Sequence, residues 1–165
     1  MRILVISDTH IPAQAVSLPD IIKAEARKSD CCLHCGDFTS ALIYKTLSSW
    51  IKTYAVCGNM DDAVLRRELP PKRILHFEGI GLGLVHGGGH PDNLIPYVQK
   101  QFLKETEDID IFVFGHSHHA LDEEREGKIY FNPGSLTDTM FASVRSYGIL
   151  TINQKKIERR IISLE

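Results

Sequence analysis

The stretch MRILVISDTH, residues 1–10, decides how the fold of this chain is interpreted. It opens with a short apolar run that cannot span a bilayer or form the core of a signal peptide. We therefore expect Arg2–Ile6 to be the first strand of a buried sheet, with the polar sequence Asp8-Thr9-His10 after its carboxyl end. Because this run is no export signal, the cytoplasm is the expected location.

Apolar runs and amphipathic stretches alternate through the first half of the chain. Two further strands are expected at Cys31–His34 and Thr53–Cys57, with helices at Leu18–Lys28 and Ser40–Trp50 between the strands. Strands that alternate with helices are typical of a parallel sheet covered by helices.

The second half of the chain changes character. It predicts a helix near Asp92–Thr106 and six more strands, several joined by tight turns: Arg73–Phe77, Leu82–His86, Ile109–Phe114, Lys128–Asn132, Tyr147–Asn153 and Lys156–Ser163. Parallel units followed by hairpins indicate an α/β fold in which two β-sheets pack as a sandwich flanked by helices. At 165 residues, the whole of 1–165 is expected to be a single domain.

Composition limits the classes of partner. The chain is 43% hydrophobic and 24% charged, which is typical of a globular domain, and its net charge is −2. No global positive field therefore draws it to nucleic acid or to an anionic membrane, and we expect neither as a partner. Self-association into a homo-oligomer stays open at this point.

The sequence Cys32-Leu33-His34-Cys35 has the C-x-x-C spacing of a redox motif. Redox motifs of this kind stand where a strand gives way to the start of a helix, whereas this one lies inside an expected strand. We therefore interpret its cysteines as small buried side chains that stay reduced.

Side chains able to bind a metal ion stand at the carboxyl ends of five of the expected strands. This set is Asp8 and His10, Asp37, Asn59, His86, and His116 and His118. Open α/β sheets place their sites at the carboxyl ends of the strands, so we expect these side chains to converge. Residues two apart in an extended chain point the same way, which pairs Asp8 with His10 and His116 with His118.

The chemistry of this set predicts a pair of metal ions. Oxygen and imidazole ligands suit Mn, which we expect first, and also Fe, Zn, Ni or Co. Seven ligands exceed one ordinary site but fill two if one carboxylate bridges. Two ions about 3.5–4 Å apart can generate a bridging hydroxide at neutral pH and stabilise its attack on a phosphate ester.

In chain order, these residues resemble the motifs of the calcineurin-like metallophosphoesterases. The matching sequences are Asp8-x-His10, Gly36-Asp37, Gly58-Asn59-x-Asp61, His86-Gly87 and Gly115-His116-x-His118. A further turn, Asn132-Pro133-Gly134-Ser135, resembles one in the small single-domain phosphodiesterase branch of that family. The resemblance also implies a two-sheet sandwich flanked by helices.

Carried over residue by residue, the resemblance implies how the ligands divide. One ion would be held by Asp8, His10 and His118. The other would be held by Asn59, His86 and His116, with Asn59 also counted as a catalytic residue. The resemblance implies further that Asp37 bridges both ions.

One position departs from the family pattern. The asparagine motif commonly continues with a histidine that assists the leaving group, and Met60 stands there in this chain. The residue that usually supports that histidine, Asp61, is present. Methionine cannot transfer a proton, so assistance to the leaving group is in question.

The leading hypothesis is a phosphoric ester hydrolase, a phosphodiesterase rather than a phosphatase, that acts on a small soluble phosphate ester. A non-catalytic metal-binding scaffold of the same fold is the alternative from another class. A nuclease ranks lowest, because the chain lacks a basic groove signature. Among the other histidines, we interpret His90 as a loop residue and His34 and His119 as structural.

Overall fold

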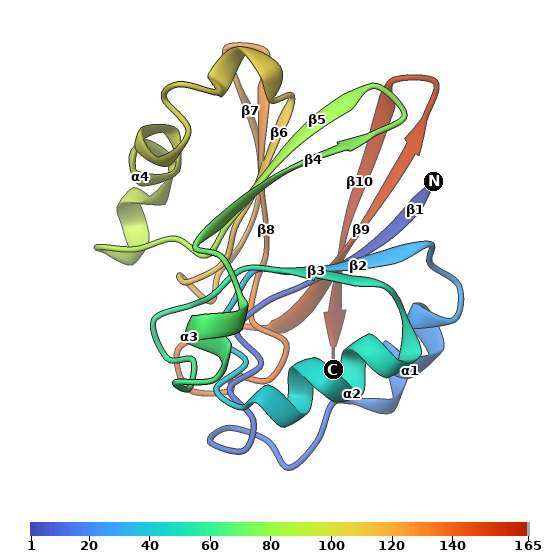
Figure 1. Ribbon diagram of the computed structural model, residues 1–165, viewed down its shortest axis with the longest axis vertical. Helices are drawn as coiled ribbons and strands as arrows, with labels where there is room; N and C mark the ends of the chain where they lie inside the picture. Colours follow the sequence, from blue (N-terminus) through green and yellow to red (C-terminus); the bar gives the residue numbers. More distant parts are fainter. Residues whose placement is uncertain (165) are drawn as a thin grey trace.

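The computed structural model of the chain describes residues 1–164 and contains two five-stranded sheets (Figure 1). The first sheet has the strand order β10-β9-β1-β2-β3. Its strands are β1 (Arg2–Ile6), β2 (Cys31–His34), β3 (Thr53–Ala55), β9 (Arg145–Asn153) and β10 (Lys156–Leu164). The second has the order β4-β5-β6-β8-β7. Its strands are β4 (Lys72–Phe77), β5 (Ile80–Val85), β6 (Ile111–Val113), β7 (Ala120–Arg125) and β8 (Lys128–Pro133).

Both sheets combine parallel and antiparallel pairs. Strands β1, β2 and β3 are parallel, as are β5, β6 and β8, and antiparallel strands flank both groups. Parallel strands need a crossover between them, and helices supply most of these connections. The helices are α1 (Asp20–Ala26), α2 (Ala41–Trp50), α3 (Leu65–Glu68) and α4 (Leu94–Gln101), with short 3-10 turns η1 (Pro91–Asn93) and η2 (Thr106–Asp108).

Strand β1 shows why the opening apolar run has no polar alternation. Successive side chains of a strand point to opposite faces of the sheet. Ile3 and Val5 pack between the two sheets, whereas Leu4 and Ile6 pack against the layer that contains α1 and α2. Both faces of β1 are therefore buried, as in a parallel sheet covered on both sides.

Helix α4 covers the outer face of the second sheet, as Figure 1 shows at the left. Its buried side chains Leu94, Ile95 and Val98 belong to a cluster that also contains Phe112 and Tyr130 from the sheet. The sandwich is thus flanked by helices on both outer faces, which confirms the fold class expected from the sequence. No helix within residues 1–164 is long and apolar enough to cross a bilayer.

Three details differ from the sequence-based expectations. Strand β7, with the sequence ALDEER, was not expected, because it is an edge strand whose charged side chains face solvent. The short helix α3 was also not expected. The helix expected near Asp92–Thr106 is an eight-residue helix, α4, with a separate 3-10 turn on each side. The last two expected strands are joined by a tight turn, as predicted, since Asn153 of β9 pairs with Lys156 of β10.

Candidate metal centre

All seven side chains singled out in the sequence lie just beyond the carboxyl ends of strands, and both sheets contribute. Asp8 and His10 follow β1, Asp37 follows β2, and Asn59 follows β3. The second sheet contributes three histidines: His86 follows β5, and His116 and His118 follow β6. The structure brings these seven side chains together in two adjoining clusters.

The first cluster contains Asp8, His10 and His118. The Oδ1 atom of Asp8 lies 3.8 Å from Nε2 of His10 and 3.6 Å from Nε2 of His118. This oxygen is buried and has no hydrogen-bond partner within residues 1–164. A buried carboxylate oxygen without a partner is costly, so this arrangement fits a cation held among the three side chains.

The second cluster is formed by Asn59, His86 and His116. The Oδ1 atom of Asn59 lies 3.0 Å from Nε2 of His86 and 3.1 Å from Nδ1 of His116. The Nε2 atom of His86 also lies 3.3 Å from Oδ2 of Asp37. Amide oxygen, carboxylate oxygen and imidazole nitrogen thus meet at one point, as in sites for first-row transition metals.

Asp37 stands between the two clusters. Its Oδ2 atom lies 3.7 Å from Nε2 of His10 and 3.3 Å from Nε2 of His86. Its Oδ1 atom accepts a hydrogen bond of 2.7 Å from the backbone N–H of Met60. One carboxylate therefore faces both clusters, which is the position that a bridging ligand requires.

Hydrogen bonds outside the clusters fix the tautomers of three histidines. His86 Nδ1 donates to the carbonyl of Cys35 at 2.7 Å, and His116 Nε2 donates to the carbonyl of Gly89 at 3.1 Å. His118 Nδ1 is hydrogen-bonded to the carboxylate of Asp138. In neutral imidazoles, the other ring nitrogen then presents its lone pair to the cluster, which is the usual support of a metal-binding histidine.

The electrostatics of His86 also show that the second cluster attracts positive charge. Burial opposes the charged imidazolium, but the hydrogen bond to Asp37 and the charges of Asp8 and Asp37 outweigh it. Together these effects raise the pKa of His86 to about 9. Without a metal ion, a proton on His86 would offset the negative charge of Asp8 and Asp37. When a divalent ion binds, it would take the place of that proton.

Five of the seven residues have left-handed backbone conformations: Asp8, His10, Asp37, His116 and His118, with φ from 40° to 71°. For residues other than glycine, this conformation costs energy and is concentrated at functional sites. The pairing expected for an extended chain was therefore wrong for one pair, although Asp8 and His10 do lie together in the first cluster. Instead of pairing with each other, His116 and His118 turn to different clusters.

Backbone hydrogen bonds hold these strained loops together. Asp8 N–H donates to the carbonyl of Gly36 at 3.1 Å, and His10 N–H donates to the carbonyl of Asp37 at 3.0 Å. Gly58 must remain small, because a Cβ atom there would lie 2.8 Å from Cγ of Asp37. The loops after β1, β2 and β3 are thus fitted closely to one another.

One residue that supports the centre, Asp138, was missed in the sequence, and another, His34, was interpreted only as structural. Asp138 is buried and contacts His118, but a lone aspartate in a loop gives no signal in the sequence. His34 is also buried, and its Nδ1 accepts a hydrogen bond from the N–H of Gly36. The Nε2 atom of His34 therefore carries the proton and lies 3.3 Å from Oγ1 of Thr9. Thr9 stands in the chain between the proposed ligands Asp8 and His10. In the sequence, the only indication of this role was that His34 stands three residues before the proposed ligand Asp37.

The turn Asn132-Pro133-Gly134-Ser135 also supports the centre. The hydroxyl of Ser135 donates to the carbonyl of Asp8 at 2.8 Å, and Asn132 Nδ2 donates to the carbonyl of Gly115 at 2.9 Å. The turn therefore holds loops that carry proposed ligands.

Asp61 is not available to orient a side chain at position 60. Its carboxylate accepts backbone hydrogen bonds from Gly58 at 2.7 Å and Thr39 at 2.9 Å, and a longer one from Asp37. Met60 itself is 55% exposed. Asp61 thus joins the loops after β2 and β3.

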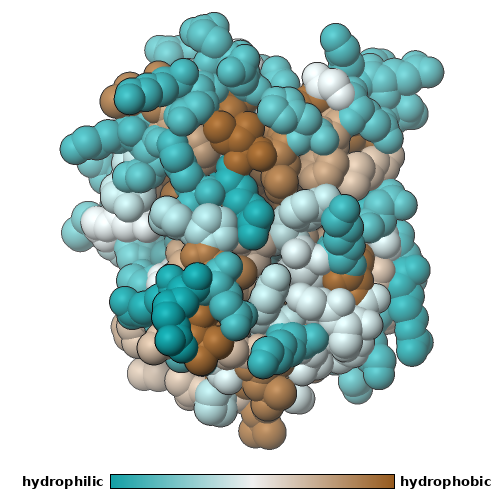
Figure 2. Space-filling view, in the orientation of Figure 1, coloured by the Kyte–Doolittle hydropathy of each residue, from teal (hydrophilic) through white to brown (hydrophobic). Residues whose placement is uncertain are grey.

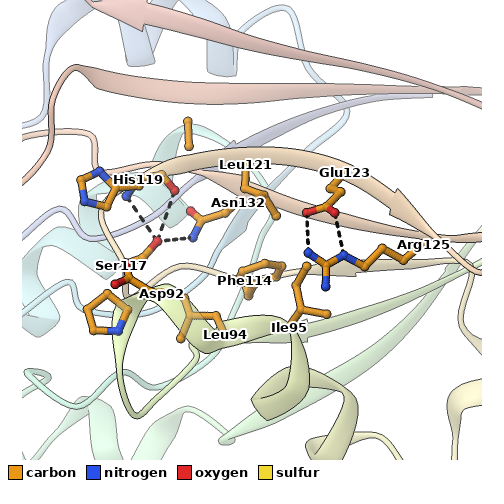
Figure 3. A pocket seen from close by; sticks show the side chains of 12 residues that line it. Asp92, Leu94, Ile95, Phe114, Ser117, His119, Leu121, Glu123, Arg125 and Asn132 are labelled. Carbon is orange, nitrogen blue, oxygen red and sulfur yellow. Dashed lines mark hydrogen bonds and ion pairs between the residues drawn. The ribbon is translucent and has the colours of Figure 1, made fainter.

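The remaining histidines lie away from the clusters. The side chain of His90 is 77% exposed and lies 3.6 Å from Asp92. His119 lines a separate cavity of about 220 Å³ between β7 and the start of α4 (Figure 3). In that cavity, Ser117 accepts hydrogen bonds from Asn132 Nδ2 and from the N–H of His119.

The C-x-x-C sequence has no features of a redox site. All four cysteines are free. Burial raises the pKa of the Cys32 and Cys35 thiols well above 9.0, which disfavours the reactive thiolate. These cysteines pack in the two clusters that cover the faces of the first sheet.

The calcineurin-like phosphoesterase superfamily domain matches residues 1–155 of this chain. A probable metallophosphoesterase of Methanothermobacter thermautotrophicus is 33% identical over 162 residues, covering 98% of this chain and 92% of the relative.

Solved structures share the fold over nearly the full length. A Thermotoga maritima protein has a TM-score of 0.77 and 31% identity, with 99% of each chain covered. Vps29 of Entamoeba histolytica in complex with zinc has a TM-score of 0.75 and 24% identity, with 99% of each chain covered. An archaeal phosphodiesterase has a TM-score of 0.73 and 21% identity, covering 99% of this chain and all of the other. The last two likenesses show the fold alone.

Proposed function

This chain belongs to the calcineurin-like phosphoesterase superfamily, and from that premise we propose that it is a phosphodiesterase with a two-ion centre. One ion would be held by Asp8, His10 and His118, and the other by Asn59, His86 and His116. Asp37 would bridge them. The observation that carries the proposal is the position of Asp37 Oδ2, which faces a histidine of each cluster at 3.7 and 3.3 Å.

The bound ions would supply Lewis acidity for the phosphate and acidify the water that attacks it. The chain itself supplies orientation. Asp138 and the carbonyls of Cys35 and Gly89 fix the rings of three histidines, so their ligand nitrogens need no reorganisation. The hydrogen-bonded loops after β1 and β2 hold both carboxylates in place.

Asn59 has a second group to offer the reaction. Its Oδ1 faces His86 and His116, so the amide NH₂ is left to donate a hydrogen bond to a phosphate oxygen. The residue is exposed, so this donor is accessible to a substrate. We therefore assign Asn59 both a ligand and a catalytic role.

Charge balance favours a diester over a monoester. Two divalent ions bring four positive charges, and Asp8 and Asp37 return two negative ones. A hydroxide nucleophile and a diester monoanion neutralise the remainder, whereas a monoester dianion leaves a negative excess. Mn is the ion we expect first, with Fe, Zn, Ni or Co able to use the same ligands.

We propose that the substrate is a small ester, and that neither nucleic acid nor a membrane is required. The net charge of −2 supports this, since nucleic-acid binding draws most of its affinity from cationic side chains. Self-association and a cytoplasmic location remain predictions.

A metal-binding scaffold is the second candidate, and Met60 is the observation that favours it, because this side chain cannot protonate a leaving group. Hydrolysis of bis(p-nitrophenyl) phosphate and of p-nitrophenyl phosphate by the Mn-loaded protein separates the two. A phosphodiesterase gives the higher kcat/KM on the diester. Verified metal loading with no turnover of either ester would establish the scaffold instead.

A further inference from the structure

Three exposed apolar side chains belong to loops that adjoin the candidate metal centre. Met60, Met140 and Phe141 are 55%, 80% and 68% exposed, and we call them the apolar rim. Resting on the phosphodiesterase function above, we propose that this rim binds the organic group of the substrate, and that this group is an aromatic ring attached to the phosphate oxygen.

The rim is attached directly to the centre at two points. Met60 follows the proposed ligand Asn59, and its backbone N–H donates to Oδ1 of Asp37 at 2.7 Å. The ring of Phe141 lies 6.4 Å from the ring of His118, in an edge-on arrangement. An organic group on a phosphate held at the metal ligands would therefore have Met60 and Phe141 within its surroundings.

One carboxylate fixes the rim relative to a ligand. Asp138 accepts backbone hydrogen bonds from Met140 at 2.7 Å and from Phe141 at 3.2 Å. The same carboxylate is hydrogen-bonded to Nδ1 of His118. The loop that carries two rim residues is thus held by the group that orients a metal-binding imidazole, and this holds the rim in place before a substrate arrives.

Exposure of single apolar side chains is ordinary in a globular protein. On the face shown in Figure 2, such side chains surface as separate patches among hydrophilic ones. The rim differs because it adjoins the candidate metal centre: Met60 follows Asn59 of the second cluster, and Phe141 lies beside His118 of the first. Apolar surface beside a site with convergent polar groups is the usual composition of a ligand-binding site.

The chemistry of the rim indicates an aromatic occupant. Methionine sulfur and the Phe141 ring both interact favourably with aromatic rings. The rim also presents no proton donor where the family commonly has histidine, so the leaving group must depart as a stable anion. A phenol-type oxygen meets both conditions, because its anion is stabilised by the ring that the rim binds.

Calorimetry on the Mn-loaded protein tests the rim without turnover. The probes are phenylphosphonate and methylphosphonate, neither of which has an ester bond to break. We expect wild type to bind the phenyl compound roughly three- to tenfold more tightly, as one or two aromatic contacts provide. Phe141→Ala combined with Met140→Ala should remove this preference and leave the affinity for methylphosphonate unchanged.

Two control variants change apolar side chains elsewhere. Leu103→Ala alters another exposed residue, and Leu121→Ala alters the cavity beside His119. Both should retain the preference for the phenyl compound. Thermal melts matched to wild type ensure that the rim variants are folded, and Phe141→Tyr, which keeps the ring, should also retain the preference.

Several results would overturn the proposal that the rim binds the organic group of the substrate. Equal affinity of wild type for both phosphonates, or a preference that survives the double variant, removes the binding role. A double variant that changes self-association in sedimentation but not phosphonate binding assigns these residues to a protein interface instead. If neither phosphonate binds to verified metal-loaded protein, the rim proposal fails, whereas the phosphodiesterase function is judged separately by hydrolysis of bis(p-nitrophenyl) phosphate.

Discussion

Nε2 of His10 and Nε2 of His118 lie 3.1 Å apart, although 108 residues separate them in the chain. His10 lies in the loop after β1 of the first sheet, and His118 lies in the loop after β6 of the second. Because Asp138 is bonded to Nδ1 of His118, the Nε2 atom of that ring presents a lone pair to its neighbour. A cation shared by the two rings would satisfy both nitrogens and connect the two sheets.

The bridging position of Asp37 predicts an asymmetry between ligand variants. Asp37→Asn removes the one carboxylate that faces both clusters, so we expect ion content to fall at both sites. His86→Ala affects one cluster and should leave about half of the wild-type content. Elemental analysis of the purified variants measures the difference. Equal losses, or full content in Asp37→Asn, would show that Asp37 does not bridge.

Asp138 should act as a positioning residue for His118. Replacing it with asparagine keeps the size but weakens the hold on the imidazole, so we expect metal affinity to fall about 10- to 100-fold. Asp92→Asn is a matched control, because Asp92 is exposed and pairs with His90, which is not a proposed ligand. Titration with Mn under competition from a chelator gives the affinities. Unchanged affinity in Asp138→Asn would refute this role.

The sequence predicted the layers of the fold because its strands are unusually apolar. The run Ile3–Ile6 is buried on both faces, and short runs of this kind are typical of a covered parallel sheet. Strand β7 was missed for the opposite reason: its charged side chains face solvent, and only pairing with β8 defines it. Pairing between distant segments has no local signal.

The positions of the strand ends predicted that the seven side chains converge, whereas only the family resemblance implied how they divide between the clusters. The convergence followed from the rule that sites form at the carboxyl ends of the strands. The division between clusters depends on the left-handed conformations of residues such as His116 and His118, with φ of 71° and 61°. A spacing rule for an extended chain does not anticipate these conformations. The roles of Asp61 and Asp138 likewise depend on loops that only the folded chain brings together.

Stability at acidic pH should depend on Glu25, which is buried in α1 beside Arg2 and Lys28. Burial opposes its ionisation, but hydrogen bonds from both cations outweigh this and hold its pKa below the usual 4.5. A lowered pKa in the folded state stabilises the protein above pH 4.5, and this stabilisation is lost as the pH falls through the folded value.

Glu25→Gln should therefore be less stable than wild type at neutral pH, by about 1–3 kcal/mol, with the difference shrinking below pH 4.5. Denaturant unfolding across the pH range measures it. Glu124→Gln, at an exposed position, should show no such pattern. A difference that persists undiminished at the lowest pH would contradict the ion-pair origin.

Leaving-group acidity should control the rate, because Met60 cannot donate a proton. Nitrophenyl esters should react well and esters of simple alcohols poorly, since a positioned acid typically contributes about 10²–10⁴-fold. Met60→His should gain mainly on alkyl esters, and Met60→Gln should not. The gain will be limited, because Asp61 is engaged with backbone N–H groups and cannot orient the new ring. A shallow dependence of log kcat on leaving-group pKa in wild type would show that another residue supplies the proton.

The number of ions needed for turnover tests the two-ion centre most directly. Protein stripped with a chelator is titrated with Mn while hydrolysis of bis(p-nitrophenyl) phosphate is followed. The arrangement of Asp37 between two clusters predicts no activity without metal and a rate that rises until two ions are bound per chain. Full activity at one ion per chain, or activity that survives verified removal of metal, would contradict it.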